Sequence, residues 1–293
     1  MLEVPEQITP EFPSRIVCLT EETTETLYLL GEEHRIVGVS GYTVRPAAAR
    51  SKPKVSAFTS AKIDKILALE PDLVLAFSDL QSDIVRELVR RGLTVFTFNQ
   101  RSVLSILQMI EALARVIGVV ERGKALVAQL RNNLDEIRRS ASRFAFRPRV
   151  LFEEWKDPLI SGIRWVEELI EIAGGTPIFP DLRLQALGKD RIVAPAEVIE
   201  RDPEVIIASW CGVKVNKRFI RSRAGWSEIS AVRNNHIYEV KSTYILQPGP
   251  ASLTEGVRQL HAILAHVAKA QVESRHAPQE RLDPDLIAQQ SKL

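Results

Sequence analysis

The chain alternates short apolar runs with segments of helical pattern, and one long stretch, residues 102–145, breaks this alternation because it is helical almost throughout. Runs such as RIVCL are typical of buried strands, and amphipathic segments such as DIVRELVRRG are typical of helices. Strands are expected at 15–19, 35–40, 72–77, 94–98, 149–155, 204–210 and 236–240, and helices at 24–31, 62–71, 83–92, 164–175, 195–203 and 252–270. Such alternation builds parallel sheets. The sequence therefore predicts an α/β fold with two Rossmann-like lobes, whose mostly parallel sheets are joined by one long α-helix.

The ends of the long helical stretch divide the chain. The pattern breaks near Gly118, and the strand–helix alternation resumes after Pro148. We expect an N-terminal α/β lobe at 14–118, a linking helix at 119–146, a C-terminal α/β lobe at 147–270 and a polar tail at 271–293. The segments KILALEPDLVLAF and EVIERDPEVIIAS share a helix–proline–strand order, which is consistent with one unit used twice, although such junctions are common.

Charge and hydropathy exclude some classes of partner. The net charge of +2 gives no reason to expect nucleic acid, and no apolar run reaches the length of a membrane span, so no membrane insertion is expected. The first residues, MLEVPEQITPEFPS, contain acids and three prolines without an apolar core, which is not typical of a signal peptide. The protein is expected in the cytoplasm as the chain stands, and in the periplasm if a leader was removed.

Residues that follow the predicted strands are the candidates for ligand binding, because ligands bind beyond the carboxyl ends of strands in open parallel sheets. In the first lobe the candidates are Glu21, Glu22, Tyr42, Phe58, Ser78, Asp79, Asn99 and Gln100. In the second lobe they are Glu154, Trp155, Arg164, Trp165, Trp210, Cys211 and Tyr244. Trp155 and Trp210 directly end apolar strands, which favours a position in a cleft. Trp165 starts a helix, where packing on the sheet is as well supported as ligand contact.

Motifs of common enzymes are absent from the sequence. It contains no G-x-S-x-G, H-E-x-x-H or phosphate-binding glycine loop, and its five histidines do not follow predicted strands. Cys18 and Cys211 have no metal-binding or redox spacing, so no metal site and no intrinsic cofactor are expected. A binding protein rather than an enzyme is therefore predicted. The rival hypothesis is a hydrolase or lyase that uses Glu153 or Glu154 as a general base.

Three segments resemble one known family. RIVCLTEETTETLYLLGEEHRIVGVS is similar to the opening strand, helix and second strand of the helical-backbone class (class III) of ABC-transporter substrate-binding proteins, and KIDKILALEPDLVLAF resembles the segment before their third strand. EEWKDPLISGIRWVEELIEIAGG is most similar to the branch that binds cobalamin. The resemblance covers about residues 14–270, and the single helix between lobes is its hallmark.

The resemblance implies a function and partners. Family members hold cobalamin, ferric siderophores or haem between two lobes, so a cobalamin-like corrinoid or a metal chelate is the implied ligand, and an ABC permease is the implied partner. Docking acids of the family correspond to Asp64 on the first lobe and, displaced by one residue from Ala196, to Glu197 on the second. This displacement leaves open a cytosolic relative that binds or delivers its ligand without a transporter.

Overall fold

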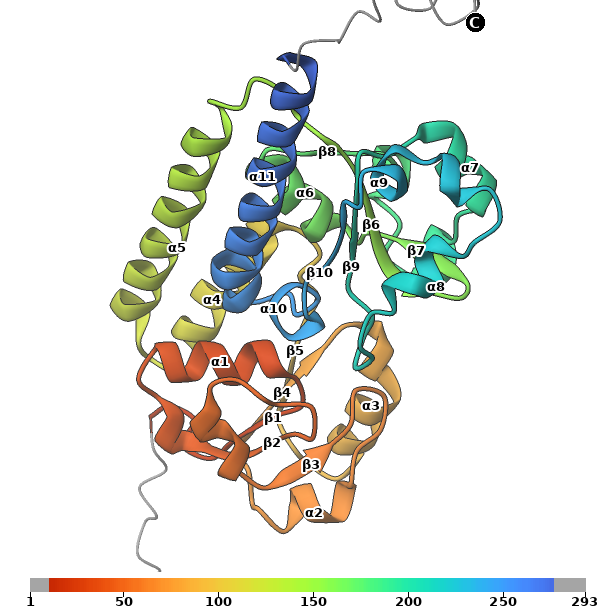
Figure 1. Cartoon of the computed structure of the whole chain (residues 1–293). Coiled ribbons are helices and arrows are strands. Elements are labelled where there is room, and N and C mark those ends of the chain that lie inside the picture. Colours follow the sequence, from red (N-terminus) through yellow and green to blue (C-terminus); the bar gives the residue numbers. More distant parts are fainter. Residues whose placement is uncertain (1–10, 277–293) are drawn as a thin grey trace, which may run out of the picture.

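The N-terminal lobe is built on a five-stranded parallel sheet. The computed structural model describes residues 11–276, and it places the first sheet at one end of the molecule (Figure 1). The strands run in the order β3-β2-β1-β4-β5, and every neighbouring pair is parallel. Their bounds are Ile16–Cys18 (β1), Ile36–Ser40 (β2), Lys54–Ser56 (β3), Leu73–Phe77 (β4) and Val95–Phe98 (β5), with helices Glu21–Leu29 (α1), Ile63–Leu67 (α2) and Ser82–Arg90 (α3).

The C-terminal lobe has a mixed sheet in which most pairs are parallel. β6 lies at its centre and pairs in parallel with β9 and β8, and β9 pairs in parallel with β10. Only β7 runs antiparallel, as the second arm of a hairpin with β6. The bounds are Arg149–Lys156 (β6), Leu159–Ser161 (β7), Thr176–Pro177 (β8), Val205–Ala208 (β9) and Ile237–Glu239 (β10), with helices Arg164–Ala173 (α6), Pro195–Arg201 (α7), Lys217–Arg221 (α8), Ser230–Arg233 (α9) and Ser242–Ile245 (α10).

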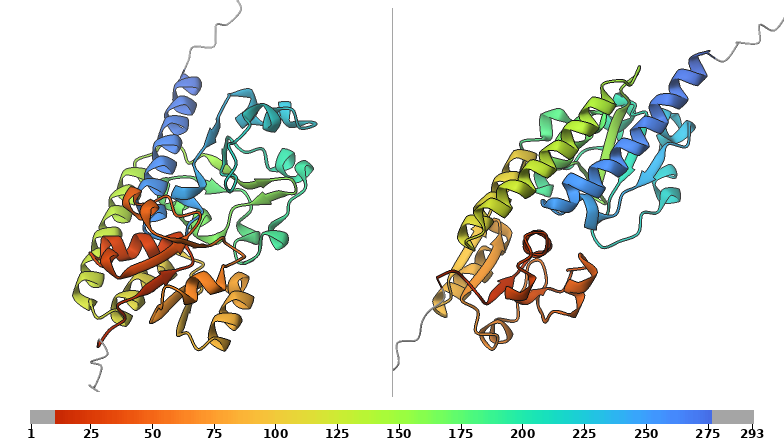
Figure 2. Two further views of the ribbon diagram at one scale, coloured as in Figure 1. Left: turned by 90° about the horizontal axis from the view of Figure 1, so that it is seen from below. Right: turned by 90° about the vertical axis from the view of Figure 1, so that its left-hand side faces the viewer.

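A layer of long helices runs along one side of both lobes. It consists of Val103–Val116 (α4), Val120–Ala141 (α5) and Val257–His276 (α11), and α11 is preceded by a π-helical turn at Ser252–Gly256. Figures 1 and 2 show α5 running from the N-terminal lobe along the C-terminal lobe, beside α11. None of the helices within residues 11–276 has the length and apolarity that crossing a membrane requires.

Alternate side chains of the strands pack on opposite faces of each sheet, and the faces turned toward the long helices belong to one apolar core that both lobes share. In β1, Ile16 and Cys18 face the long helices, whereas Val17 packs on the opposite side with α2 and α3. In β9, Ile207 faces the long helices and Ile206 packs in a separate cluster of the C-terminal lobe. Because successive side chains in a strand point to opposite faces, each sheet is covered on both faces. The central apolar cluster is continuous from β1 to α11.

The structure confirms the predicted α/β architecture and corrects several bounds. α1 begins at Glu21 rather than at residue 24, because Thr20 adopts an extended N-cap conformation and two acids occupy the first turn, where a helix favours negative charge. The segment after Trp155 turns back to form the β6–β7 hairpin, and the strand β7 was not expected from the sequence. α11 continues through His276, so the first residues of the predicted polar tail are helical, and the rest of that tail lies outside the described residues.

Candidate functional site

Loops at the carboxyl ends of the strands meet where the two lobes face each other, and we call this region the interlobe junction. It comprises the segments after β1, β4 and β5 from the N-terminal lobe, and the segments after β6, β8, β9 and β10 from the C-terminal lobe. Several hydrogen bonds join the two sides. Gln100 Nε2 donates to the Pro248 carbonyl at 3.1 Å, and the backbone N–H of Ala251 donates to Glu25 Oε2 at 3.1 Å. Gln100, a predicted ligand-binding residue of the first lobe, therefore lies at the contact between the lobes.

Arg101 spans the junction, although the sequence did not single it out. Its guanidinium donates to Asp79 Oδ1 at 3.0 Å and to Asn99 Oδ1 at 3.0 Å within the first lobe, and to the Ala186 carbonyl at 3.2 Å across the junction. It also lies over the Phe77 ring, 5.3 Å from the ring centre. Burial, the largest influence, lowers the pKa of Arg101. Arg101 therefore fixes two of the predicted residues and tethers the lobes at this point.

Exposed apolar side chains flank the junction on both lobes. Tyr42 follows β2 and is 58% exposed, and Leu80 follows β4 and is 44% exposed. From the second lobe, Leu184 is 73% exposed and Val213 is 43% exposed. Single exposed apolar residues are ordinary, but these four sit on loops at the carboxyl ends of strands. The flanks of the junction therefore offer apolar surface to a ligand.

Glu153, one of the two candidate bases, is fully buried and held by two donors. Arg223 donates to both of its carboxylate oxygens, at 2.6 and 2.9 Å, and the Trp210 indole N–H donates to Oε1 at 2.9 Å. Burial raises the pKa of Glu153, and Arg223 opposes that rise. A carboxylate with both oxygens engaged and no exposed surface has no access to a substrate proton. Glu153 therefore holds the β6–β7 hairpin through its hydrogen bonds with Arg223 and Trp210.

Glu154, the other candidate, forms a bidentate ion pair with Arg191. The two distances are 2.7 and 3.1 Å, and the side chain of Arg191 is only 1% exposed. Arg191 also donates to the Ser161 carbonyl, so the pair anchors the β6–β7 hairpin to the segment after β8. The carboxylate of Glu154 thus lies at the edge of the junction with its charge balanced by Arg191.

Glu21 and Glu22 lie in the first turn of α1, at the base of the junction. Glu22 is 1% exposed, and its Oε1 accepts a hydrogen bond from Thr20 Oγ1 at 2.7 Å. Burial, with a smaller contribution from Glu21, raises the pKa of Glu22 to about 8. Burial also raises the pKa of Glu21. A Cβ added to Gly249 of the opposite lobe would lie 2.4 Å from Glu22 Cβ, so the lobes meet closely over this carboxyl group.

The predicted tryptophans divide into one half-buried and two core residues. The expectation that Trp210 faces an open cleft is wrong, because it is 2% exposed and packs in the second-lobe core beside Phe219. Trp165 is 3% exposed, and its indole N–H donates to the Ile245 carbonyl at 2.9 Å, so it packs on the central core. Trp155 is half-buried at the end of β6, and its indole N–H donates to the Asp157 carbonyl at 3.0 Å.

The remaining predicted residues occupy varied positions. Phe58 is half-buried, 6.4 Å from the Phe77 ring centre. Tyr244 lies under Arg45, 4.8 Å from ring centre to guanidinium carbon. Arg164 pairs with Glu168 at 2.8 Å on α6, away from the strand-end carboxylates. Ser78, Asp79 and Asn99 line one depression beside β5.

Cys211 and Cys18 differ strongly in environment. Cys18 is fully buried in β1, and burial raises its pKa to about 12. Cys211 is an exposed residue just beyond β9, and partial burial of its thiol, together with the negative charges of Glu21 and Glu154, raises the pKa of that thiol.

We expect a thiol reagent to label one cysteine of the native protein, because only Cys211 is accessible. The second equivalent should react only in denaturant. The measurement is mass spectrometry of the labelled protein, with Cys211→Ser as the control that abolishes native labelling. Two rapidly labelled thiols in the native protein would contradict the burial of Cys18.

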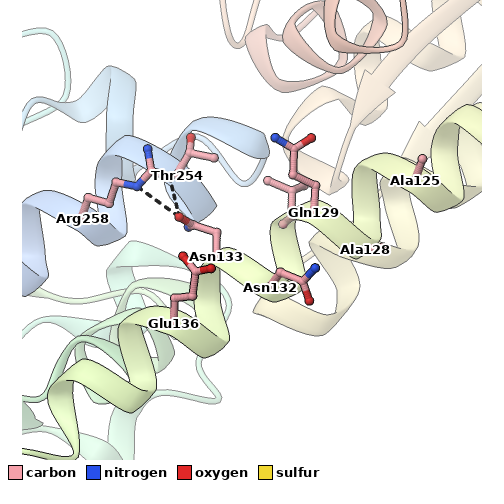
Figure 3. Close-up of a pocket in the computed structure, with 9 residues that line it drawn as sticks. Ala125, Ala128, Gln129, Asn132, Asn133, Glu136, Thr254 and Arg258 are labelled. Atoms are coloured by element: carbon pink, nitrogen blue, oxygen red, sulfur yellow. Dashed lines mark hydrogen bonds between the residues drawn. The ribbon is translucent and has the colours of Figure 1, made fainter.

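A separate cavity lies on the helical side of the molecule. It has a volume of about 460 Å³ and is lined by one face of α5 and by the segment that leads into α11. Figure 3 shows Gln129, Asn132 and Glu136 along α5, with Asn133 accepting hydrogen bonds from Arg258. This cavity contains none of the predicted ligand-binding residues. Within residues 11–276, no three His, Cys, Asp or Glu side chains are grouped so that they could hold a metal ion.

The two predicted docking acids are both exposed on short helices of different lobes. Asp64 in α2 has a side chain that is 97% exposed. Glu197 in α7 is exposed as well, but its Oε2 accepts a hydrogen bond from the backbone N–H of Ala194 at 2.9 Å. Glu197 therefore already caps its own helix, whereas Asp64 is free of such a role.

The fold and the junction define a class of two-lobe, ligand-binding proteins with a helical backbone. Residues 16–244 match the family described as periplasmic binding protein. The chain belongs to this family. It is 27% identical over 257 residues to an uncharacterized ABC transporter substrate-binding lipoprotein, YvrC, of Bacillus subtilis, covering 85% of this chain and 79% of that protein. It is also 27% identical over 257 residues to the vitamin B12-binding protein of Vibrio cholerae, covering 85% and 89%.

Solved structures agree with this assignment. The periplasmic vitamin B12 binding protein BtuF of Vibrio cholerae is 25% identical and superposes with a TM-score of 0.71, covering 88% of this chain and 98% of that one. The periplasmic heme-binding protein RhuT of Roseiflexus has a TM-score of 0.74 at 22% identity, covering 87% and 99%, and supports the fold alone. The predicted class, a substrate-binding protein of ABC-transporter type, is confirmed.

Proposed function

We propose that the protein binds a cobalamin-like corrinoid at the interlobe junction, without acting on it chemically. The observation that carries this proposal is the charge pattern. Three carboxylates of the junction are already paired with arginines, as Glu153 with Arg223, Glu154 with Arg191, and Asp79 with Arg101. With apolar side chains on its flanks, this surface suits a large ligand that is nearly neutral and carries many hydrogen-bonding groups. A corrinoid with amide side chains has this character.

A polyanionic ligand fits the junction less well. A bare ferric siderophore complex or a haem with two carboxylates requires unpaired cations, and Arg101 and Arg191 are each engaged by carboxylates. The relatives named for vitamin B12 also support a corrinoid. The enzyme hypothesis loses support, because Glu153 and Glu154 both have their oxygens occupied by arginine.

We infer that transport remains the role of this chain, because the similar proteins are named as periplasmic or lipoprotein components. This favours the periplasmic alternative over a cytosolic carrier. The exposed acids Asp64 and Glu197 are the proposed contacts for an ABC permease. The linking helix and lobe boundaries predicted from the sequence fit such a two-lobe carrier, since α5 spans both lobes (Figure 2).

The proposal is tested by titrating the protein with cyanocobalamin, which absorbs in the visible range, and with haem. Calorimetry is expected to give a dissociation constant for cobalamin of about 1 µM or lower, near −8 kcal/mol, and binding of haem at least tenfold weaker. Tyr42→Ala, which removes the exposed aromatic side chain after β2 on the flank of the junction, should weaken cobalamin binding by roughly 1–3 kcal/mol.

Leu29→Ala is the matched control, because Leu29 is 51% exposed at the far end of α1. It should leave affinity unchanged. Binding of haem in preference to cobalamin would replace the proposed ligand, and loss of affinity in the Leu29 variant alone would move the site away from the junction.

A further inference from the structure

The loop after β9 and the short helix α8 form a strongly basic part of the C-terminal lobe. Residues 205–227 contain five lysines and arginines and no aspartate or glutamate, although the net charge of the whole chain is only +2. One of the five, Arg223, is engaged by the buried Glu153. The other four are exposed, and we call them the basic surface: Lys214, Lys217, Arg218 and Arg221.

The cations of the basic surface differ from those of other helices in their partners. Exposed arginines elsewhere pair with a carboxylate one turn away, as Arg86 does with Asp83 in α3. Within residues 11–276, no carboxylate forms an ion pair with any of the four. Arg221 donates to the Asn235 amide oxygen, and Lys217 lies over the Tyr238 ring, 5.7 Å from its centre. Their positive charge is therefore not balanced by a neighbouring acid.

The fold gains little from this clustering of charge. Lys217 begins α8, and a helix disfavours a cation at its start. Lys217 and Arg221 are four residues apart, a spacing at which like charges repel each other. The Asn216 side chain holds the first turn by accepting from the backbone N–H groups of Arg218 and Phe219, at 3.0 and 3.1 Å. The stability of α8 therefore does not explain why its cations are gathered together.

The basic surface lies on the side of the C-terminal lobe that faces away from α5 and α11 (Figure 1). Ile220 of α8 and Val198 of α7 pack in the same second-lobe cluster, on the face of the sheet opposite to the long helices. α7 carries Glu197, which is one of the proposed contacts for a permease. A permease that meets Glu197 would therefore turn the layer that contains α8 toward the membrane around it.

Exposed apolar side chains lie among these cations. Val213 is 43% exposed in the loop after β9, and Phe219 is 39% exposed in α8. None of the four cations lines the cavity beside α5 or the depression beside β5, so neither hollow uses them to enclose a small anion. Exposed lysines and arginines interleaved with an aromatic and an aliphatic side chain are typical of segments that lie at the surface of an anionic bilayer.

We propose that the basic surface binds the anionic lipid headgroups of a membrane. Each of its cations gains from the negative potential of such a surface, and Val213 and Phe219 can enter the boundary between headgroups and acyl chains. An acidic protein would meet the cations but would not offer that apolar boundary. The inference rests on the proposed transport role, which brings this face of the protein to a membrane.

The test measures binding of the full chain to sedimented vesicles at physiological ionic strength. Wild type should bind vesicles made of equal parts of phosphatidylcholine and phosphatidylglycerol, and it should not bind vesicles of phosphatidylcholine alone. Added salt should weaken this binding, because it screens exposed charges. The quadruple variant Lys214→Gln/Lys217→Gln/Arg218→Gln/Arg221→Gln should bind the anionic vesicles at least about fiftyfold more weakly, since each cation near an anionic bilayer strengthens binding by roughly fivefold.

The matched control removes the same amount of charge from exposed positions along α5 and just after it, in the variant Lys124→Gln/Arg131→Gln/Arg139→Gln/Arg143→Gln. It should bind anionic vesicles within about threefold of wild type, because charges on the far side of the protein lie beyond the screening length. Circular dichroism should show that both variants are folded.

Two results would overturn the inference. One is no binding of wild type to anionic vesicles, which would leave an acidic protein surface as the partner that the basic surface fits. The other is an equal loss of vesicle binding in both quadruple variants. Vesicle binding needs no corrinoid, so the titration with cyanocobalamin tests the proposed ligand separately. Failure of cobalamin to bind would overturn that ligand and leave the vesicle result standing.

Discussion

Replacing Arg223 with methionine is expected to lower the free energy of unfolding by about 3–5 kcal/mol, the usual cost of leaving one member of a buried ion pair without its partner. Glu153 is fully buried, and Arg223 donates to both of its oxygens. Arg223 also donates to the Lys156 carbonyl and stacks 4.4 Å from the Trp226 ring centre, so methionine cannot replace its contacts. The measurement is urea unfolding at pH 7.

The effect should depend on pH in a defined direction. Arg223 lowers the pKa of Glu153 and so opposes the effect of burial. Without Arg223, the pKa of Glu153 should therefore rise further. A carboxyl group whose folded pKa lies above its unfolded value is stabilising below the unfolded pKa, and this contribution is lost as the pH rises. The destabilisation by Arg223→Met should therefore be smaller at pH 4 than at pH 7.

Two further variants separate the ion pair from other causes. Arg218→Met removes an exposed arginine from α8, the short helix that precedes Arg223, and should change stability by less than about 0.5 kcal/mol. The double variant Glu153→Gln/Arg223→Met should recover part of the loss, because no charge is then left buried. A single Arg223 variant as stable as wild type would show that the pair contributes nothing to the fold.

The fold was predictable because strand and helix patterns are local. The short apolar runs and their order determine which strands are parallel, and the structure confirms both lobes. The burial of Trp210 was also readable in principle. Ile206 and Ala208 lie on one face of β9, Trp210 continues this alternation two residues beyond the strand, and all three pack in the same core cluster. The position of Trp210 after an apolar run did not show on which face of the sheet its indole would pack.

The arginines that pair with Glu153 and Glu154 could not be predicted from one sequence. Arg191 ends a short 3-10 helix and Arg223 lies in a bend, 37 and 70 positions from the glutamates they pair with. Nothing local in those segments predicts the pairing, because only the packed sheet brings them to β6. Arg101 was missed for a similar reason, since its role depends on the Ala186 carbonyl of the other lobe.

The second large effect concerns the buried carboxyl group at the base of the junction. Glu22→Gln is expected to stabilise the protein at pH 9 by at least about 2 kcal/mol and to leave stability at pH 5 nearly unchanged. Burial raises the pKa of Glu22 from 4.5 to about 8 in the folded protein. The group is therefore stabilising below pH 4.5, and this stability is lost as the pH rises towards 8.

The expected size of the stabilisation follows from the same pKa difference. The difference between a folded pKa of about 8 and an unfolded pKa of 4.5 corresponds to roughly 5 kcal/mol, which is the upper limit. The side chain of glutamine can also take over the hydrogen bonds of Glu22. Glutamine has the same shape, can still accept from Thr20 Oγ1 and can donate to Gln100 Oε1, a buried oxygen that has no hydrogen-bond partner in the described part of the chain. Urea unfolding between pH 5 and pH 9 measures the difference, and Glu33→Gln at an exposed position is the control. A pH dependence of stability identical in wild type and Glu22→Gln would mean that Glu22 is ionised in the folded protein at neutral pH, and that the close approach of Gly249 does not keep this carboxyl group protonated.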